Sequence, residues 1–312
     1  MRVAAALLVA ASLTAGCGGQ TQPRVAGYYL VYVDRLAAPR VVLARVDGTH
    51  AHAIANGDNP ALSPDGRWVA FVQQDQKLFV ASTRGGKPRF LARIESWPVW
   101  SPASDRIATL TGNGLISVDL HGHVTVLNRN PDVGSGGWGF SPDGRRLVYT
   151  TDGGLVVGRA TGGFGHALTQ GSDLEPVWGK RWIAFARYAP LAGIWRIRPD
   201  GSGLRRVLPP PTHPERNGIW GFYPIAWAPD EDALLAELGM ADAWDVAIRI
   251  DVATGRYRHV HGYPVSLSRD GRLALLSVGR NGPHEVITAP FGRRGRVRVL
   301  ARGDVCCPSW NR

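Results

Sequence analysis

The sequence predicts an all-β fold, a single β-propeller, and three observations support this prediction. A pattern recurs with a period near 40 residues, each copy contains four short expected strands, and the two ends of the chain supply complementary parts of one further copy. The 39 Gly, 22 Pro and 11 Trp among 312 residues are the turn formers and aromatic residues that many short strands require. No convincing helical pattern interrupts the repeat.

The repeat is clearest in three segments, PALSPDGRWVAFV from Pro60, PVWSPASDRIATL from Pro98 and WGFSPDGRRLVYT from Trp138. Weaker copies begin at positions 176, 225 and 265, and a stub, PSWNR, ends the chain. The serine or its counterpart falls at positions 63, 101, 141, 179, 228, 268 and 311, so the intervals are 38, 40, 38, 49, 40 and 43 residues. A period of this size is typical of repeat architectures.

Each unit contains four expected strands in a fixed order. The first is the P-x-W-S segment, and the Pro-Asp-Gly turn after it is tight because Pro fixes φ and Gly accepts a positive φ. The second strand is an apolar run such as 68–72 or 183–186, and the third alternates, as at 194–197. A second turn, such as Asp47-Gly48, leads to the fourth strand, as at 299–300. Four antiparallel strands of this kind make one propeller blade.

The ends of the chain predict how the ring closes. The first unit begins at a second-strand run, 28–33, and lacks a P-x-W-S strand, whereas the C-terminal segment 306–310 supplies one. We expect seven blades, the composite one closed by pairing of the N- and C-terminal segments, which leaves no free sheet edge there. Six blades are the alternative, if the degenerate unit at 224–262 merges with a neighbour.

These segments resemble the TolB-type propeller family, whose units carry the pattern P-x-W-S-P-D-G-x-x-[IL]-A-F followed by an Asp-Gly turn. The resemblance covers nearly all of the chain after its N-terminal segment. It implies the propeller fold together with a role as a periplasmic interaction module, a surface lipoprotein or the gating domain of a serine peptidase. The chain lacks room for the extra N-terminal α/β domain of the translocation-protein member, so that particular role is not implied.

The N-terminal segment predicts export. Arg2 is followed by an apolar run, 3–13, that is too short to span a bilayer, and by small residues directly before Cys17. The small residues before the cysteine resemble a bacterial lipobox, which implies diacylglyceryl transfer to the Cys17 sulfur, cleavage before it and an acylated N-terminus. An ordinary secreted protein and an uncleaved anchor are the alternatives.

The expected organisation is therefore a signal peptide at 1–16, a lipidated tether at 17–24 and the propeller at 25–312. No later segment is long and apolar enough to be a membrane span. The expected location is the cell envelope, with the protein lipid-anchored to a membrane on its extracytoplasmic side.

The formal net charge of +11 is compatible with binding to anionic lipid or to an acidic wall polymer. The simpler explanation, which we favour, is a coding bias towards Arg. Nucleic acid is not an expected partner outside the cytoplasm.

One face of the predicted ring carries the variable loops. Turns between first and second and between third and fourth strands are short, whereas the other loops vary and share the opposite face, where binding residues concentrate on such scaffolds. The longest interval contains a proline-rich segment, 209–218, and aromatic residues after it. The candidate partner-binding residues on this face are Tyr188, His213, Glu215, Arg216, Trp220, Tyr223, Trp244 and His284. The competing interpretation is a longer loop whose aromatic residues pack between blades.

Several motifs that could carry chemistry do not fit the repeat. The pairs His50/His52, His121/His123 and His259/His261 fall near outer strands of separate blades, so we expect no metal site. The glycine spacing at 134–139 matches a dinucleotide motif, but a strand and no helix follows it. No G-x-S-x-G segment is present. The tryptophans at positions 100, 178, 227 and 310 recur with the repeat and are expected in the core, and the arginines between 293 and 302 are expected on a solvated hairpin.

Cys306 and Cys307 are the two cysteines besides Cys17. An exported protein can be oxidised, and neighbouring cysteines can close a strained eight-membered ring. We favour two reduced thiols on alternating faces of a strand, with a vicinal disulfide as the alternative.

These observations predict a monomeric, membrane-tethered, non-enzymatic propeller that binds another envelope protein or polymer through its variable-loop face, with no catalytic residue, metal or cofactor. The alternative is an enzyme or a carbohydrate-binding protein with a site in the central channel. Channel-facing carboxylates and histidines from several blades would be the signature of that alternative.

Overall fold

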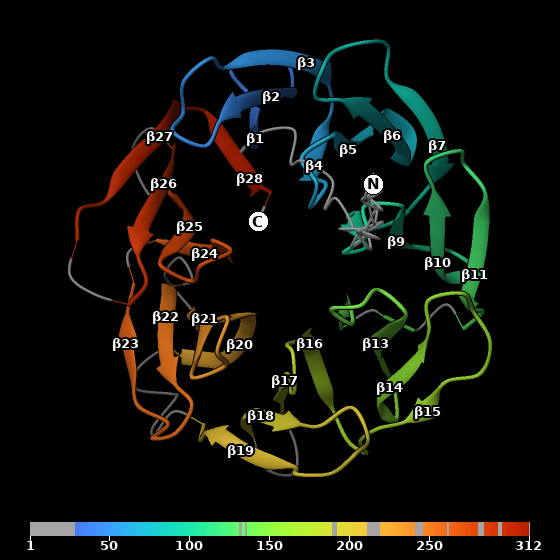
Figure 1. The fold of residues 1–312 in the computed structure, drawn as a ribbon, viewed down its shortest axis with the longest axis vertical. Helices are drawn as coiled ribbons and strands as arrows, with labels where there is room; N and C mark the ends of the chain where they lie inside the picture. Colours follow the sequence, from blue (N-terminus) through green and yellow to red (C-terminus); the bar gives the residue numbers. More distant parts are fainter. Residues whose placement is uncertain are drawn as a thin grey trace, which may run out of the picture.

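The computed structural model describes residues 29–130, 133–134, 136–188, 192–210, 219–240, 246–260, 262–279, 284–292 and 295–311, with the backbone alone for 219, 220 and 240. Seven four-stranded antiparallel sheets stand around a central axis as the blades of a propeller (Figure 1). The prediction of seven blades is confirmed, because the degenerate unit forms a sheet of its own. Cys17 and the predicted signal peptide lie outside the described residues.

The blades follow one another in chain order, and within each blade the strands run in order from the inner to the outer edge of the sheet. Blades 1 to 4 are β28 (Val305–Trp310), β1 (Tyr29–Asp34), β2 (Arg40–Arg45), β3 (His52–Asn56); β4 (Asp58–Leu62), β5 (Trp68–Gln73), β6 (Lys77–Ser82), β7 (Arg89–Arg93); β8 (Val99–Trp100), β9 (Arg106–Thr111), β10 (Gly114–Asp119), β11 (Val124–Asn128); and β12 (Trp138–Phe140), β13 (Arg146–Thr151), β14 (Gly154–Arg159), β15 (His166–Ala167). Blades 5 to 7 are β16 (Asp173–Trp178), β17 (Ile183–Arg187), β18 (Gly193–Ile197), β19 (Arg205–Leu208); β20 (Ile219–Trp227), β21 (Ala233–Met240), β22 (Val246–Asp251), β23 (Tyr257–His259); and β24 (Tyr263–Leu267), β25 (Leu273–Val278), β26 (His284–Pro290), β27 (Arg298–Gly303). One 3-10 turn, Gln74–Gln76, joins β5 to β6. Within the described part of the chain, no helix is long and apolar enough to cross a membrane.

The Ser-Pro-Asp-Gly turns fold as their sequence predicts. In blade 2 the Ser63 hydroxyl donates to an Asp65 carboxylate oxygen at 2.7 Å, and the backbone N–H of Trp68 donates to the same hydroxyl at 3.0 Å. Gly66 closes the turn with a φ of 70° and donates its N–H to the Ser63 carbonyl. Each turn therefore satisfies its own polar groups and fixes where the second strand begins.

The ring closes through the predicted composite blade. β28 pairs antiparallel with β1, with Leu30 opposite Trp310 and Val33 opposite Cys306. Trp310 and Leu30 then pack with Leu275 of blade 7 in one buried cluster. The other apolar clusters likewise lie between neighbouring blades, so the core is a set of layers that stabilise the ring only when it is complete.

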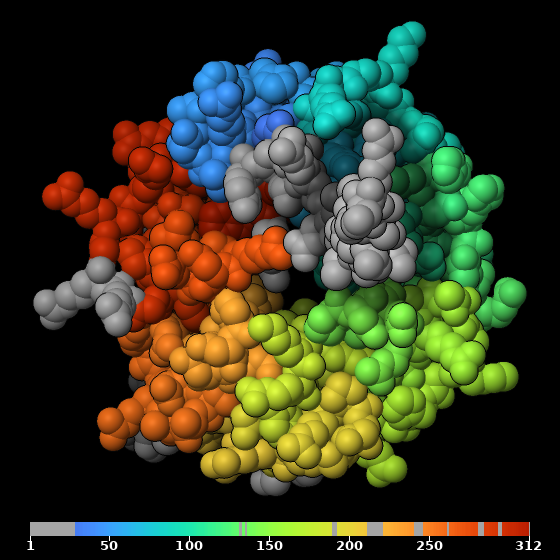
Figure 2. Space-filling view, viewed as in Figure 1, coloured from blue at the N-terminus to red at the C-terminus, as the bar shows by residue number. Residues whose placement is uncertain are grey.

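Two faces result from this up-and-down order. We call the face with the first-to-second and third-to-fourth strand turns the short-turn face, and the opposite one the variable-loop face. The inner strands surround a centre that is hollowed in the space-filling view (Figure 2).

Candidate binding site in the central channel

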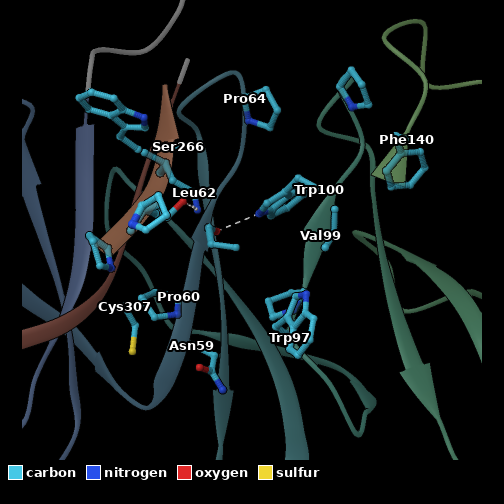
Figure 3. A pocket seen from close by; sticks show the side chains of 18 of the residues that line it. Asn59, Pro60, Leu62, Pro64, Trp97, Val99, Trp100, Phe140, Ser266 and Cys307 are labelled. Atoms are coloured by element: carbon cyan, nitrogen blue, oxygen red, sulfur yellow. Dashed lines mark hydrogen bonds between the residues drawn. The ribbon is translucent and has the colours of Figure 1, made fainter. Parts of the chain in front are cut away.

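The inner strands enclose a cavity of about 860 Å³. Described residues of blades 1, 2, 3, 4, 5 and 7 contribute to it, at or next to β28, β4, β8, β12, β16 and β24. The cavity runs along these strands from Asn59, Trp97 and Cys307 at one end to Pro64 at the other (Figure 3). Because the inner strands begin at the variable-loop face, the Trp97 end of the cavity belongs to that face.

Aromatic rings and prolines dominate the lining. The aromatic residues are Trp97, Trp100, Phe140, Trp178, Tyr263 and Trp310, and the prolines are Pro60, Pro64, Pro98, Pro102, Pro142, Pro264 and Pro308. Proline is tolerated here because an inner strand is an edge strand, whose free side needs no N–H donor. Among the described residues that line the cavity there is no Asp, Glu, His, Lys or Arg.

Trp97 presents the largest exposed apolar surface in the cavity. Its side chain is 53% exposed, although its ring stacks on Trp138 with centroids 5.6 Å apart and planes at 8°. Trp100 is held by a hydrogen bond from its Nε1 to the Ala61 carbonyl at 2.8 Å, which joins blades 3 and 2 (Figure 3). Both rings are thus fixed before any ligand arrives, so binding costs little side-chain entropy.

The recurring tryptophans have two roles. Trp100 and Trp310 are buried between blades, and Trp178 packs at the edge of the blade 4–5 cluster, as expected for the core. All three also line the cavity, whereas Trp227 packs against the blade 5–6 cluster and donates to the Val177 carbonyl. From the sequence, core packing and a ligand-facing surface are alternative roles for these tryptophans. In the closed ring, a tryptophan of an inner strand can have both roles.

A β-bulge at the start of several inner strands shapes the same end of the cavity. Asn59, Glu175 and Cys307 each precede a proline and have φ between 48° and 55°. The register shifts at these points, so side chains there do not alternate between the two strand faces.

The sulfur atoms of Cys306 and Cys307 meet in this bulge in the arrangement of a vicinal disulfide. The arrangement corresponds to the less favoured of the two interpretations of the sequence, and the oxidation state itself stays a prediction. The bulge is the physical reason, because it brings the two sulfur atoms together where a regular strand would separate them. A carboxylate oxygen of Asp58 lies within 4.8 Å of both sulfurs, but Asp58 pairs with Arg35 at 2.8 Å and a disulfide offers no thiolate to a metal.

Carboxylates on the described inner strands are held away from the cavity. Asp58 pairs with Arg35, and Asp173 forms a buried bidentate pair with Arg187 at 2.5 and 2.7 Å. Burial raises the pKa of Glu175, which stands at the bulge of β16 and does not line the cavity. The described part of the ring therefore does not bring carboxylates and histidines of several blades together in the channel.

Two of the predicted partner-binding residues meet on the variable-loop face. The hydroxyls of Tyr188 and Tyr223 are 2.5 Å apart and their rings are in edge contact, which joins blades 5 and 6. Tyr188 is 48% exposed, and both tyrosines line a small pocket with Phe222 and Pro210. Phe222 itself is buried against Tyr257, in line with the interpretation that some loop aromatics pack between strands.

Of the other predicted partner-binding residues, the structure describes the side chain of His284. His284 begins β26 on blade 7, with its Nδ1 3.9 Å from an Asp304 oxygen. His213, Glu215, Arg216 and Trp244 lie outside the described residues, as does the side chain of Trp220.

The histidine pairs, the glycine-rich segment and the arginine run occupy separate places. His52 and His259 are on the outer strands of blades 1 and 6, His121 and His123 precede the outer strand of blade 3, and His261 lies outside the described residues. The glycine-rich segment before residue 140 leads into β12, as expected. Of the arginine run, Arg302 pairs with Glu285 at 2.8 Å, and residues 293 and 294 lie outside the described part.

Solved structures share this architecture. TolB from Acinetobacter baumannii matches with a TM-score of 0.58 at 14% identity, over 92% of this chain and 67% of TolB. The chain has a TolB-like β-propeller fold. An oligogalacturonate lyase from Vibrio parahaemolyticus matches with a TM-score of 0.58 at 14% identity, over 88% of this chain and 85% of the lyase. Puromycin hydrolase matches with a TM-score of 0.63 at 18% identity, over 89% of this chain and 53% of the hydrolase, so this chain spans about half the length of that enzyme.

No protein-family model matches the sequence, and no curated protein matches it either. At 14 to 18% identity the similar structures show the fold alone. Because a lyase and a hydrolase stand beside TolB among them, the shared fold does not determine the role of this chain.

Proposed function

We propose that this protein is a non-enzymatic binding propeller of the cell envelope that takes an apolar segment of another envelope protein into its channel from the variable-loop face. The observation that carries the proposal is the lining of the cavity, which contains tryptophans and prolines and, among the residues that the structure describes, no side chain with a formal charge. A cavity of about 860 Å³ has the size of a ligand site and would accept a few side chains of a peptide. Aromatic-lined grooves of this kind suit proline-containing or aromatic segments.

The pair of exposed Tyr188 and partly buried Tyr223 offers a further aromatic surface. Tyr188 and Tyr223 lie on the variable-loop face, where the Trp97 end of the cavity also belongs. Large, rigid aromatic side chains at the centre of an interface supply most of its binding energy. A partner that inserts one segment into the channel would rest its remaining surface on these rings and on the loops around them.

The lining also supports the absence of catalysis. General acid–base and nucleophilic steps require ionisable or activated groups within reach of the substrate, and the carboxylates of the described inner strands are paired or do not line the cavity. A channel enzyme or a carbohydrate-binding protein is the second candidate, favoured by the aromatic lining and by the similarity to an oligogalacturonate lyase. In the principal proposal the chain is a monomer held at the membrane through lipidated Cys17.

Crosslinking in native membranes, followed by mass spectrometry, identifies the partner and then measures its capture. We expect Trp97→Ala to lower capture at least tenfold, because truncation of a central tryptophan commonly costs about 2 kcal/mol or more. The double variant Tyr188→Ala/Tyr223→Ala should lower capture as well. Melting temperature, measured in parallel, shows that the ring is intact.

Phe90→Ala is the matched control, because Phe90 is similarly exposed, at 49%, but stands on the outer strand β7. Capture by this variant should equal that of the parent. Full capture by both the Trp97 and the tyrosine variants would overturn the proposal. Turnover of a peptide or oligosaccharide panel by the parent, lost in Trp97→Ala, would replace it with the enzyme.

A further inference from the structure

Among the described residues, basic and acidic side chains are distributed unequally between the two faces of the ring. Turns of the short-turn face carry basic residues such as Arg67, Arg84, Lys87 and Arg145. Loops of the variable-loop face carry acidic residues such as Asp75, Glu95 and Asp152. The net positive charge of the chain is thus concentrated on the face opposite the Trp97 end of the channel.

Blade 5 carries a cluster of basic residues on the short-turn face. The guanidinium carbons of Arg196 and Arg198 lie 4.2 and 5.0 Å from the centre of the Trp182 ring, and Arg205 is the cross-strand neighbour of Arg196. Cation–π contacts hold the arginines in place but do not neutralise them. We call Arg181, Arg196, Arg198 and Arg205, with Trp182, the arginine cluster.

The arginine cluster has more positive charge than its surroundings compensate. Glu231 already accepts hydrogen bonds from the Nε and the backbone N–H of Arg181, both at 2.9 Å. Asp200 of the β18–β19 turn is a second carboxylate, close enough to Arg198 to interact with its charge, so two carboxylates face the four arginines. The Nε of Arg196 is buried without a hydrogen-bond partner in the structure. Burial, and after it the charges of Arg205 and Arg181, lower the pKa of Arg196, in line with an excess of positive charge around this side chain.

Exposed apolar side chains stand in turns of the same face. Leu204 is 45% exposed in the β18–β19 turn, next to Arg205. In the equivalent turn of blade 4, Phe164 is fully exposed. Basic residues around protruding apolar tips are the composition of surfaces that bind anionic bilayers, where arginines meet phosphate groups and apolar tips enter the headgroup region.

The first described residue of the chain, Tyr29, lies on the same face. β1 begins at Tyr29, whose backbone N–H donates to Asn311 Oδ1 at 2.7 Å, just beyond the end of β28. The end of β28 and the start of β1 meet where the other blades have a first-to-second strand turn, so Tyr29 lies at the short-turn face.

We propose that the short-turn face of blades 4 and 5 docks on the anionic phospholipid headgroups of a bilayer. Arg198 and Arg205 contact the phosphates, and Phe164 and Leu204 enter the headgroup region. The variable-loop face then points away from the membrane with the Trp97 end of its channel open to a partner. This inference does not rest on the proposed partner, because a vesicle alone tests it.

The test uses the full chain carrying Cys17→Ser, which removes covalent lipid. Co-sedimentation is measured with vesicles of phosphatidylcholine and with vesicles of phosphatidylcholine mixed with phosphatidylglycerol, at low and high NaCl. The measured quantity is the ratio of binding to the anionic vesicles over binding to the phosphatidylcholine vesicles. The apolar N-terminal segment contributes to binding of both vesicle types, so the ratio reports the effect of the anionic lipid. The parent should prefer anionic vesicles, and salt should remove the preference.

Arg198→Gln/Arg205→Gln should lower this ratio by about fivefold for each arginine, the loss expected for a basic residue at an anionic surface. Phe164→Ala should weaken binding to anionic vesicles without changing its salt dependence. The control Arg93→Gln/Arg129→Gln removes the same charge from exposed positions near the variable-loop face and should leave the ratio unchanged. Equal ratios for the two double variants, or equal binding of the parent to both vesicle types, would overturn the proposal, as would capture by soluble polyphosphate without any preference for anionic vesicles.

Discussion

At the scale of single residues, the turn after each inner strand shows how the repeat tolerates variation. Gly66, Gly144 and Gly271 take the left-handed conformation that ends the turn, but Ser104 and Glu231 occupy the same position in blades 3 and 6 with φ of 61°. A non-glycine residue there costs about 1 kcal/mol. Each of these two residues offsets this cost through hydrogen bonds with a neighbouring blade. Ser104 accepts one from the Asp65 N–H, and Glu231 accepts two from Arg181.

The buried ion pair of blade 5 gives the first stability prediction at this scale. Asp173 and Arg187 are both buried, and the guanidinium also lies 5.3 and 5.1 Å from the ring centres of Phe185 and Trp195. Asp173→Asn leaves a buried guanidinium without its counter-charge, which commonly costs about 3 to 5 kcal/mol, so we expect a loss of about 3 kcal/mol or more in the free energy of unfolding. Urea denaturation measures this loss.

The exposed pair of Glu285 and Arg302 is the matched control. Its atoms are 2.8 Å apart, but the arginine is largely in solvent, so Glu285→Gln should cost no more than about 1 kcal/mol. Equal losses in the two variants would show that burial adds nothing to the Asp173–Arg187 pair.

Residue-level rules also show where the sequence could not predict the site. A regular strand separates neighbouring side chains, which is why Cys306 and Cys307 are expected on opposite faces. The bulge that joins them depends on a positive φ at Cys307, which is not a residue type that favours that conformation. The proline that follows each bulge is visible in the sequence, and the recurrence of Asn59, Glu175 and Cys307 before proline is the signal that could have indicated it.

At the scale of the strand, the sequence predicts order and number well because each blade repeats the same local rules. Turn residues at fixed offsets and apolar second strands are sufficient to place four strands per unit. The residues that line the channel could not be predicted from the sequence, for a different reason. Prolines of the P-x-W-S segment have no visible role within one unit, whereas in the ring Pro60, Pro98 and Pro308 face a common cavity. Side chains of separate blades converge only when the ring closes, and the sequence pattern of a single unit does not contain this information.

Strand β28 carries the prediction that belongs to this scale. It pairs with β1, and it places Val305 and Trp310 in the cluster shared by blades 7 and 1. Deleting 305–312 opens the ring and removes a buried tryptophan, a loss of at least about 3 kcal/mol. Because a domain of about 150 to 250 residues loses about 2–4 °C in Tm per kcal/mol, we expect the melting temperature to fall by at least about 6 °C in a thermal scan.

Deleting 18–23, which precedes the described propeller, should leave the melting temperature nearly unchanged. If the C-terminal deletion melts like the parent, β28 is not required for closure and the composite blade does not stabilise the ring.

At the scale of the whole molecule, the two faces have complementary roles in our proposals. The short-turn face carries the excess positive charge, and the variable-loop face carries the Trp97 end of the apolar channel and the tyrosine pair. From Cys17 to Tyr29 the chain can reach at most about 40 Å when fully extended. A lipid on Cys17 would therefore keep the propeller within reach of the bilayer, on the side where the chain enters β1.

The last prediction separates the lipid anchor from the docking surface. Each basic residue contributes about 1 kcal/mol at an anionic surface and is screened by salt, whereas several acyl chains on one cysteine hold a protein through apolar burial that salt does not weaken. The wild-type protein should thus stay with cell membranes after a high-salt wash. Cys17→Ser, if it is processed, should bind membranes at low salt through the arginine cluster and be released by the wash, or it should remain as a precursor of higher mass. Fractionation with immunodetection and intact-mass measurement distinguishes these forms. Equal retention of both proteins after the wash, with both cut to the same mass, would refute the anchor at Cys17 while leaving the vesicle test of the arginine cluster unaffected.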